Sequence, residues 1–458
     1  MMRPGSPPRA TTRWVADESV PLVAPGRPQG KTGAQVRVPW LFAAAMGAAL
    51  AVAAIAGTGL GMLAALETWI GQTQWTASVQ GHGRVQLFSF AAVFVAALAF
   101  EFVVRLNGRQ PLPAWPRVVV LALIGAGAVA MAAAQLLEGR VPGLLVGGAL
   151  AGLAGAGGFF ALIARVRPAR PLRIDVQPLF FPAAGAWLVV AAVISVVAAA
   201  NATGGILGLA DSRAVSELVL RGFVLNVVAG VALRALPGHL GVRPLRQGQM
   251  VLVFAGLNTA VVLWLAGSGA PGMAAAGTMM RVGDVLLALA VVAFTWWSGV
   301  LRAFRMPGTG VERYQSLVPL AWLGLVAYAV ALAGFALAGG LHERTLYQEG
   351  AVRHILMLGF MAPLMLAFAH IVLARFGTGR IAHENALTAA FLLLMVAWPL
   401  RVIPALFTDM PSDMGRMVIA GSGVMVAVAF AMAAFVCVAT ARRIAAAHRG
   451  HGRGIAVH

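Results

Sequence analysis

The chain contains very few residues of several types that soluble and secreted proteins use freely. Of its 458 residues, one is cysteine (Cys437), three are tyrosine, and 11% are charged. A single cysteine excludes an internal disulfide and a cluster of thiolate metal ligands. The sequence also lacks a phosphate-binding glycine loop and the motifs of kinases and hydrolases. The common enzyme classes built on those motifs are therefore not indicated.

Lysine is nearly absent too, because Lys31 is the only lysine among the 34 basic residues. Together with the abundance of alanine and glycine, this composition is typical of a GC-rich bacterial genome. Net charge is +19 and the isoelectric point is about 11.8. In a soluble protein such a charge would indicate nucleic-acid binding, so the distribution of the charge decides what it means.

What the chain has in excess is apolar sequence: 60% of residues are apolar and the mean hydropathy is +0.85. A membrane-spanning helix needs roughly 20 apolar residues. Twelve such segments are present, which predicts an all-α, polytopic membrane bundle with no nucleic-acid partner. They lie near 39–63, 85–105, 116–137, 141–164, 179–201, 215–236, 249–267, 279–301, 317–339, 353–374, 386–406 and 416–440.

The basic residues divide unevenly between the two sides of such a bundle. With twelve spans, both tails and the loops after even-numbered spans share one side, which holds 25 of the 34 Lys/Arg residues, including Arg105, Arg109, Arg243 and Arg380. Cytoplasmic loops carry the excess of Lys and Arg. The distribution therefore predicts a multi-pass protein of the bacterial inner membrane with both termini in the cytoplasm.

Three stretches of the sequence resemble one another. Each contains a Phe that opens an apolar helix (Phe90, Phe223 and Phe360), and these residues are 133 and 137 positions apart. A repeat near 135 residues predicts three similar units of four helices each. We expect a disordered cytoplasmic tail (1–37), three units (38–164, 165–302 and 303–440) that form one membrane domain (38–440), and a basic tail (441–458).

Ionisable groups inside a membrane bundle are costly and often functional. Six positions before the three Phe residues stand Arg84, Glu217 and His354, beside His82, Arg221 and Arg353. A deeper set, Glu101, Arg234 and His370, follows each Phe by 10 or 11 positions and is a candidate second polar site or proton path. A plainer interpretation is local satisfaction, for example an ion pair between Glu101 and Arg105 at the i,i+4 spacing.

Two histidines from different units stand at one membrane level. His82 and His354 could ligate a single haem iron from opposite sides if their helices face each other. Alternatively, both are polar residues at helix ends that bind nothing. His370 lies 16 residues after His354, roughly 24 Å along a helix, and cannot share its metal.

Several of these segments resemble a known family. The stretch His82-Gly-Arg-Val-Gln-Leu-Phe-Ser-Phe90, with Arg105-Leu-Asn-Gly-Arg-Gln-Pro-Leu-Pro113 after it, looks like the second-helix motif of NnrS-like membrane proteins. Arg353-His-Ile-Leu-Met-Leu-Gly-Phe360 resembles the Arg-His-x-Leu-x-x-Gly-Phe motif of the same family. The resemblance covers the membrane segments but neither tail. The plan of three four-helix units is also similar to the haem–copper oxidase core, as a fold-level analogy.

The resemblance implies a twelve-helix haem- and copper-containing protein tied to nitric oxide metabolism and nitrosative stress. His82 and His354 would bind the haem iron, and Arg84 or Arg221 could pair with a haem propionate. The family motif has a second His where this chain has Arg84, and copper prefers imidazole or sulfur ligands, so the departure argues against copper. The alternatives are a small-molecule transporter and a metal-free membrane scaffold. Whether the protein is an enzyme stays open.

Overall fold

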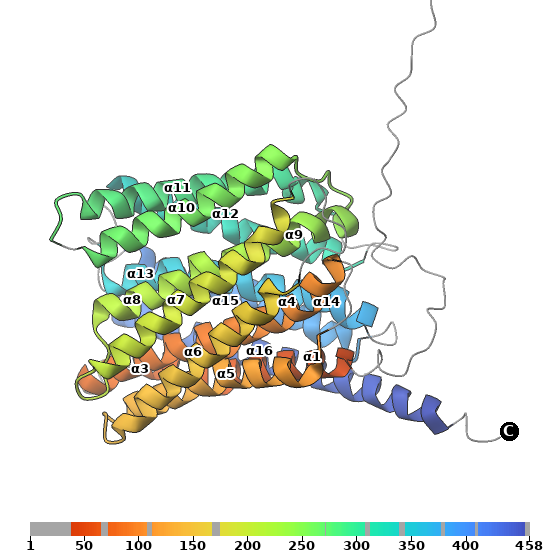
Figure 1. The fold of residues 1–458 in the computed structure, drawn as a ribbon, viewed down its shortest axis with the longest axis horizontal. Coiled ribbons are helices and arrows are strands. Elements are labelled where there is room, and N and C mark those ends of the chain that lie inside the picture. Colours follow the sequence, from red (N-terminus) through yellow and green to blue (C-terminus); the bar gives the residue numbers. More distant parts are fainter. Residues whose placement is uncertain are drawn as a thin grey trace, which may run out of the picture. The chain divides into compact units, whose positions relative to one another are not determined.

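The computed structural model describes residues 38–65, 72–107, 112–166, 175–270, 272–306, 312–338, 344–376, 381–407 and 411–453 (Figure 1). Apart from one isolated bridge between Thr203 and Ile206, the regular structure of this part of the chain is helical. Twelve of its helices are long and apolar enough to cross a membrane, which confirms the predicted helix number. The predicted tail 1–37 lies outside the described residues.

The helices are as follows: α1 (Val38–Val52), α2 (Thr58–Ala65), α3 (Gln72–Arg84), α4 (Val93–Leu106), α5 (Ala114–Leu136), α6 (Pro142–Ala164), α7 (Phe180–Ala200), α8 (Leu209–Glu217), α9 (Leu225–Leu240), α10 (Gln247–Gly269), α11 (Ala276–Ser298), α12 (Tyr314–Ala338), α13 (Leu346–His354), α14 (Ala362–Phe376), α15 (Glu384–Leu406) and α16 (Asp413–Arg453). Short π-helical segments join some of them: η1 (Ala53–Gly57), η3 (Val85–Ala92), η5 (Leu218–Val224) and η8 (Ile355–Met361). Two 3-10 turns, η4 (Gln177–Leu179) and η6 (Val300–Ala303), complete the set.

Three continuous helices lie at the centre of the bundle, and we call them the central helices: Thr73–Val104, Leu209–Leu240 and Leu346–Ala374. Within their most apolar stretch, 94% of the residues are buried in the protein, against 33–50% for the other nine. The anchor residues Phe90, Phe223 and Phe360 are fully buried here. The other nine helices therefore shield the central ones from lipid.

The central helices begin earlier than predicted, at 73, 209 and 346 instead of 85, 215 and 353. Their N-terminal segments are too polar to register as apolar sequence, because they carry groups such as His82, Arg213 and Glu349. These groups find partners inside the bundle, so the backbone stays helical around them. The prediction was wrong at these boundaries because apolar counting cannot detect polar residues that protein contacts satisfy.

A π-helical segment interrupts each central helix at the same relative position. The segments begin at Val85, Leu218 and Ile355, so they repeat the 133- and 137-residue spacing of the anchor Phe residues. Each begins directly after one of the polar residues Arg84, Glu217 and His354. Such widened turns occur often at functional sites. The grouping into three repeats stays a prediction, and this spacing supports it.

Small residues let the outer helices approach closely. A side-chain carbon added to Gly148 of α6 would lie 2.7 Å from the carbonyl oxygen of Gly127 in α5. These two helices lie side by side (Figure 1). In a bilayer, where the lipid is as apolar as the protein surface, such backbone contact supplies much of the packing attraction.

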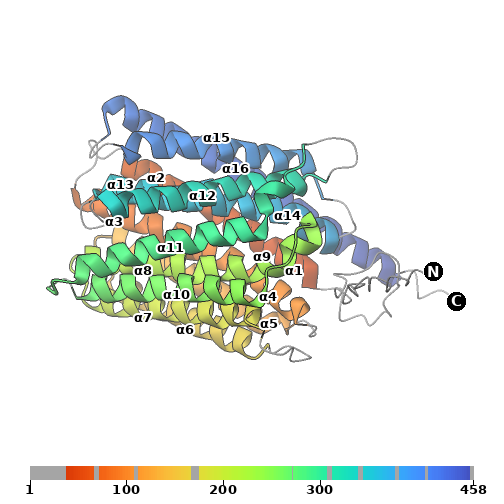
Figure 2. The ribbon, with the colours of Figure 1, turned by 90° about the horizontal axis from the view of Figure 1, so that it is seen from above.

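The last helix packs against the first. Figure 2 shows α16 beside α15, and α16 also contacts α1. It continues to Arg453, past the boundary predicted at 440, because Ala441 and Ile444 are buried and extend its packed face. The predicted basic tail is therefore helical for most of its length. This packing brings α2, α15 and α16 against the first and third central helices, where the main cavity lies.

Candidate functional site

His82 and His354 lie opposite each other, as the sequence predicted for ligands of one metal. His82 belongs to α3 and His354 is the last residue of α13. Their ring centroids are 6.0 Å apart and the ring planes are inclined by 25°. Two imidazoles on one iron, with metal–nitrogen bonds of about 2 Å and a ring radius of about 1 Å each, would place their centroids roughly 6 Å apart. The centroid separation alone is therefore compatible with a single metal between the two rings, whose planes are stacked.

The backbone fixes which nitrogen of each ring faces the cavity. The Nδ1 of His82 lies 2.6 Å from the carbonyl oxygen of Gly57, and the Nδ1 of His354 lies 2.6 Å from that of Gly350. A carbonyl oxygen only accepts, so each Nδ1 carries the proton and donates it. The lone pair of each neutral imidazole then sits on Nε2, as in metal-ligating histidines whose other nitrogen bonds a carbonyl. No described residue forms a hydrogen bond with either Nε2.

A glycine provides the room for the His82 ring. A side-chain carbon at Gly61 of α2 would lie 2.7 Å from the Nδ1 of His82, too close for the ring to keep its place. Gly57, whose carbonyl accepts the proton, lies one turn earlier in the same membrane-crossing helix. The first membrane helix therefore both leaves space for His82 and orients it.

Both imidazoles line a cavity of about 280 Å³. Its wall contains apolar residues, such as Phe90, Met357 and Phe430, and charged residues, such as Arg213, Glu349 and Arg353. Binding sites for cofactors are typically apolar clefts with a few placed polar groups. This cavity has that character, because its wall is mostly apolar and carries a few charged and polar groups.

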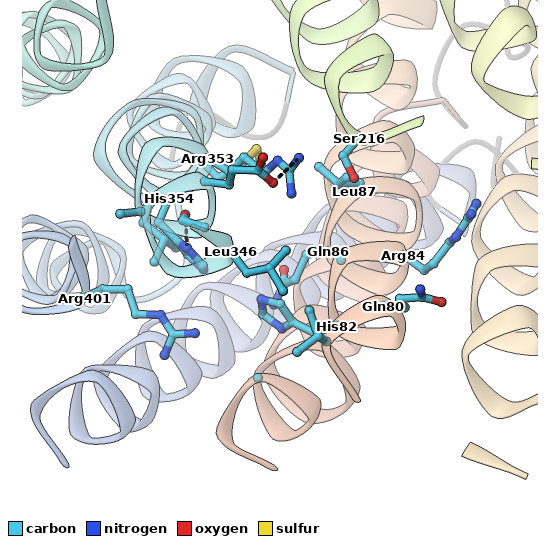
Figure 3. A pocket seen from close by; sticks show the side chains of 18 of the residues that line it. Gln80, His82, Arg84, Gln86, Leu87, Ser216, Leu346, Arg353, His354 and Arg401 are labelled. Atoms are coloured by element: carbon cyan, nitrogen blue, oxygen red, sulfur yellow. Dashed lines mark hydrogen bonds and ion pairs between the residues drawn. The ribbon is translucent and has the colours of Figure 1, made fainter. Parts of the chain in front are cut away.

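Arg401 of α15 also lines this cavity, although it was not among the predicted site residues. Figure 3 shows its side chain directed toward the space that His82 and His354 share. Its charge acts on both imidazoles. Its guanidinium donates to the carbonyl oxygen of Ile419 at 3.1 Å, and none of the described carboxylates forms an ion pair with it. A cation next to two metal-ligand candidates is thus left without a counter-ion from the described protein.

The two arginines predicted to pair with a propionate are placed differently. Arg84 lines the cavity, but Figure 3 shows its side chain on the opposite side of the helix from His82, and it donates to Ser195 at 2.7 Å. Arg221 is buried away from the cavity, where Glu217 and Asp284 both accept from it. These contacts correct the expectation for both residues, since Arg221 is already neutralised and Arg84 faces another helix.

Glu217 and Arg221 belong to a buried chain of ion pairs, which we call the ion-pair chain. It contains four arginines and three carboxylates, joined in the order Arg344–Asp284 (3.3 Å), Asp284–Arg221, Arg221–Glu217 (2.5 Å), Glu217–Arg353 (2.9 Å), Arg353–Glu349 (3.7 Å) and Glu349–Arg213 (2.9 Å). The chain links α11 to the second and third central helices and reaches the cavity at its Glu349 end.

The interior of the ion-pair chain is dry. Asp284 is completely buried, and Arg221 is buried almost as deeply. Burial lowers the pKa of the Arg344 guanidinium, and the neighbouring Asp284 acts in the opposite direction. Isolated charges would be very costly at this depth, so each charge is held by its neighbours in the chain. This arrangement leaves its inner members no capacity to bind a ligand.

The deeper predicted set, Glu101, Arg234 and His370, is satisfied locally. Arg117 pairs with Glu101 at 2.5 Å, and Arg234 pairs with Asp175 at 2.6 Å. His370 contacts the carbonyl oxygen of Leu366 through Nδ1 and the hydroxyl of Thr388 through Nε2. The side chain of Arg105, the partner predicted for Glu101, lies outside the described residues. The contacts of each residue therefore fit the plainer interpretation, in which these groups pair with local partners.

Among the described residues, no group of three or more His, Cys, Asp or Glu side chains is placed to hold a metal ion. Two histidines suit a metal that arrives with ligands of its own. Haem iron is such a metal because the macrocycle supplies four nitrogens and leaves two axial positions for the protein. The residues present therefore fit a haem.

Sequence reasoning missed Arg401, Asp284, Arg344, Arg213 and Glu349. The available signal was the cost of ionisable groups in apolar segments, and it applies most clearly to Asp284 and Arg401, which lie inside predicted spans. The predicted site residues came only from the three repeated stretches, which contain neither Asp284 nor Arg401. Glu349 and Arg344 stood outside the predicted spans, so nothing marked them as buried.

No known protein family matches the chain, and no curated protein is significantly similar to it.

Proposed function

We propose that this protein binds haem in a bacterial inner membrane and acts in nitric oxide metabolism or the response to nitrosative stress. The observation that carries the haem assignment is the pair His82 and His354, with centroids 6.0 Å apart and both Nε2 atoms free to face a metal. The nitric oxide role rests on the resemblance of the motifs that contain these histidines to those of NnrS-like proteins.

The protein's own residues would fix the cofactor in a defined orientation. His82 and His354 would hold the iron through their Nε2 atoms, and the carbonyls of Gly57 and Gly350 would hold their Nδ1 protons and make each ring a better donor. Phe90, Met357 and Phe430 would exclude water from the macrocycle. When bound, haem would supply one-electron chemistry and sensitivity to small gases.

A reduced-minus-oxidised visible spectrum of the purified protein tests the haem assignment. Protein made with adequate haem supply should show haem bands. The bands should vanish in His82→Ala and in His354→Ala and persist in His370→Ala, which removes a histidine with partners elsewhere. Wild-type protein that is folded but has no haem bands would refute the assignment and favour a metal-free scaffold or a transporter.

The topology is a second part of the proposal. Both termini would be cytoplasmic, as the excess of arginine on one side indicates. Arg243 is exposed after the second central helix, and the native Cys437 is fully buried, so an introduced cysteine at 243 can be labelled with little background. In intact spheroplasts an impermeant thiol reagent should label Arg243→Cys only after the membrane is opened. Labelling from the periplasmic side would reverse the orientation. Of the other arginines that support it, Arg109 and Arg380 lie outside the described residues.

A further inference from the structure

Arg401 is a cation inside a membrane-spanning helix, and none of the described carboxylates is its partner. Its guanidinium bonds the carbonyl oxygen of Ile419 at 3.1 Å, and no described carboxylate pairs with it. A charged side chain at such depth is costly and is found facing a partner or a cavity. Arg401 faces the cavity, beside both imidazoles (Figure 3).

The nearby carboxylates are already engaged. Glu349 is held by Arg213 and Arg353, and Glu217 by Arg353 and Arg221. Among the described residues, the cavity wall contains four arginines, Arg84, Arg213, Arg353 and Arg401, and one carboxylate, Glu349. Arg213 and Arg353 pair with glutamates and Arg84 is turned toward Ser195, so Arg401 is the arginine near the histidines that pairs with no described carboxylate.

We propose that Arg401 binds a carboxylate of the cavity's ligand, so that the ligand is an organic anion with an apolar body. An arginine binds a carboxylate through two parallel hydrogen bonds, a stronger and more directional contact than a neutral pair makes. The inference rests on the proposed function: with haem as the ligand, the carboxylate is a propionate. The sequence analysis expected Arg84 or Arg221 to pair with the propionate, and we now assign that role to Arg401.

Titration of the haem-free, full-length protein with haem and with haem dimethyl ester tests the proposal. The ester keeps the iron and the macrocycle but has no negative propionates. Wild-type protein should bind haem about tenfold or more tightly than the ester, as expected for losing a charged, bidentate contact. In Arg401→Gln the two affinities should become equal, mainly through weaker binding of haem.

Arg84→Gln is the matched control. It also removes a buried arginine without a carboxylate partner, but one that points away from the histidines, so the tenfold preference for haem should remain. Arg401→Lys should keep part of the preference, because it keeps the charge and loses the bidentate geometry.

The outcomes separate this inference from the haem assignment. Equal affinity of wild-type protein for haem and its ester would overturn the role of Arg401 and leave the histidine site standing. Folded wild-type protein that binds neither compound would overturn both. The wild-type comparison needs no substitution, so the proposal remains testable if Arg401→Gln fails to fold.

Discussion

The central helices show two different uses of polar residues at one level of the bundle. Around the second central helix, Glu217 and Arg221 belong to the ion-pair chain, in which neighbouring side chains neutralise one another. Between the first and third central helices, the Nε2 atoms of His82 and His354 form no hydrogen bond with a described residue, and Arg401 in the same cavity wall pairs with no described carboxylate. Contacts within the protein hold the first arrangement together, and we propose that a ligand completes the second.

The difference shows that buried polar residues do not by themselves mark a binding site. Both regions contain costly groups at the same depth, directly before a π-helical segment. What distinguishes them is unused hydrogen-bonding capacity. A group with all its partners stabilises the fold, whereas one with a free acceptor or an unmatched charge indicates a missing partner.

The largest effect we expect comes from breaking the ion-pair chain. Asp284→Ala would leave Arg221 and Arg344 without their shared carboxylate in a dry interior, which costs about 3–5 kcal/mol. Thermal unfolding of the detergent-purified protein should show a large drop in midpoint. If Asp284→Ala does not yield folded protein, Asp284→Asn should show a smaller drop.

The control for this change is Glu384→Gln, which weakens an ion pair with Arg313 that is nearly half exposed. Such pairs contribute about 1 kcal/mol or less, so the midpoint should hardly move. Equal effects of the Asp284 and Glu384 variants would contradict the idea that the ion-pair chain holds the second central helix in place.

A smaller effect, confined to ligand binding, is expected on the histidine side. In Gly61→Ala the added methyl group would push the His82 ring from its position, since it would lie 2.7 Å from Nδ1. Disturbing a ligand's supporting contacts typically costs about 10- to 100-fold in affinity. Haem titration followed by absorbance should show that loss with little change in the unfolding midpoint.

Gly59→Ala provides the comparison, because a methyl group there meets nothing within 4 Å. Its affinity for haem should equal that of the wild type. If both glycine variants bind haem normally, the position of His82 does not control the site.

The smallest effect is expected at Arg84, which shares features with both regions. It is a buried cation with no described carboxylate partner, and replacing a buried charge by an apolar residue of similar volume is often neutral or stabilising. Ser195 keeps its bond to the carbonyl oxygen of Ala191, so Arg84→Met strands no acceptor. The unfolding midpoint should stay the same or rise, and a clear fall would show that Arg84 has a counter-ion.

The central part of the fold could be predicted from the sequence. The parts that the prediction missed were missed for a physical reason. Apolar segments long enough to cross a bilayer are visible in any sequence, so twelve helices were predicted and found. The first turns of the central helices were missed because their polar residues are satisfied by neighbours that are distant in the sequence. Arg213 and Glu349, for example, are 136 residues apart.

The candidate site divides in the same way. The repeat spacing placed His82 and His354 at one level and singled them out as a pair, because helical rise converts sequence distance into depth. Sequence spacing does not determine which neighbouring helix a side chain faces. Hence Arg84 and Arg221 were expected beside the histidines, and Arg401 was not considered.

The sequence by itself determined that this chain forms a membrane bundle of twelve helices, because the cost of polar groups in a bilayer acts on each segment independently. Only the tertiary structure decided which polar groups satisfy one another and which remain free. That decision depends on how helices rotate and pack: packing joined Glu217, Arg221 and Asp284 and turned His82, His354 and Arg401 toward one cavity.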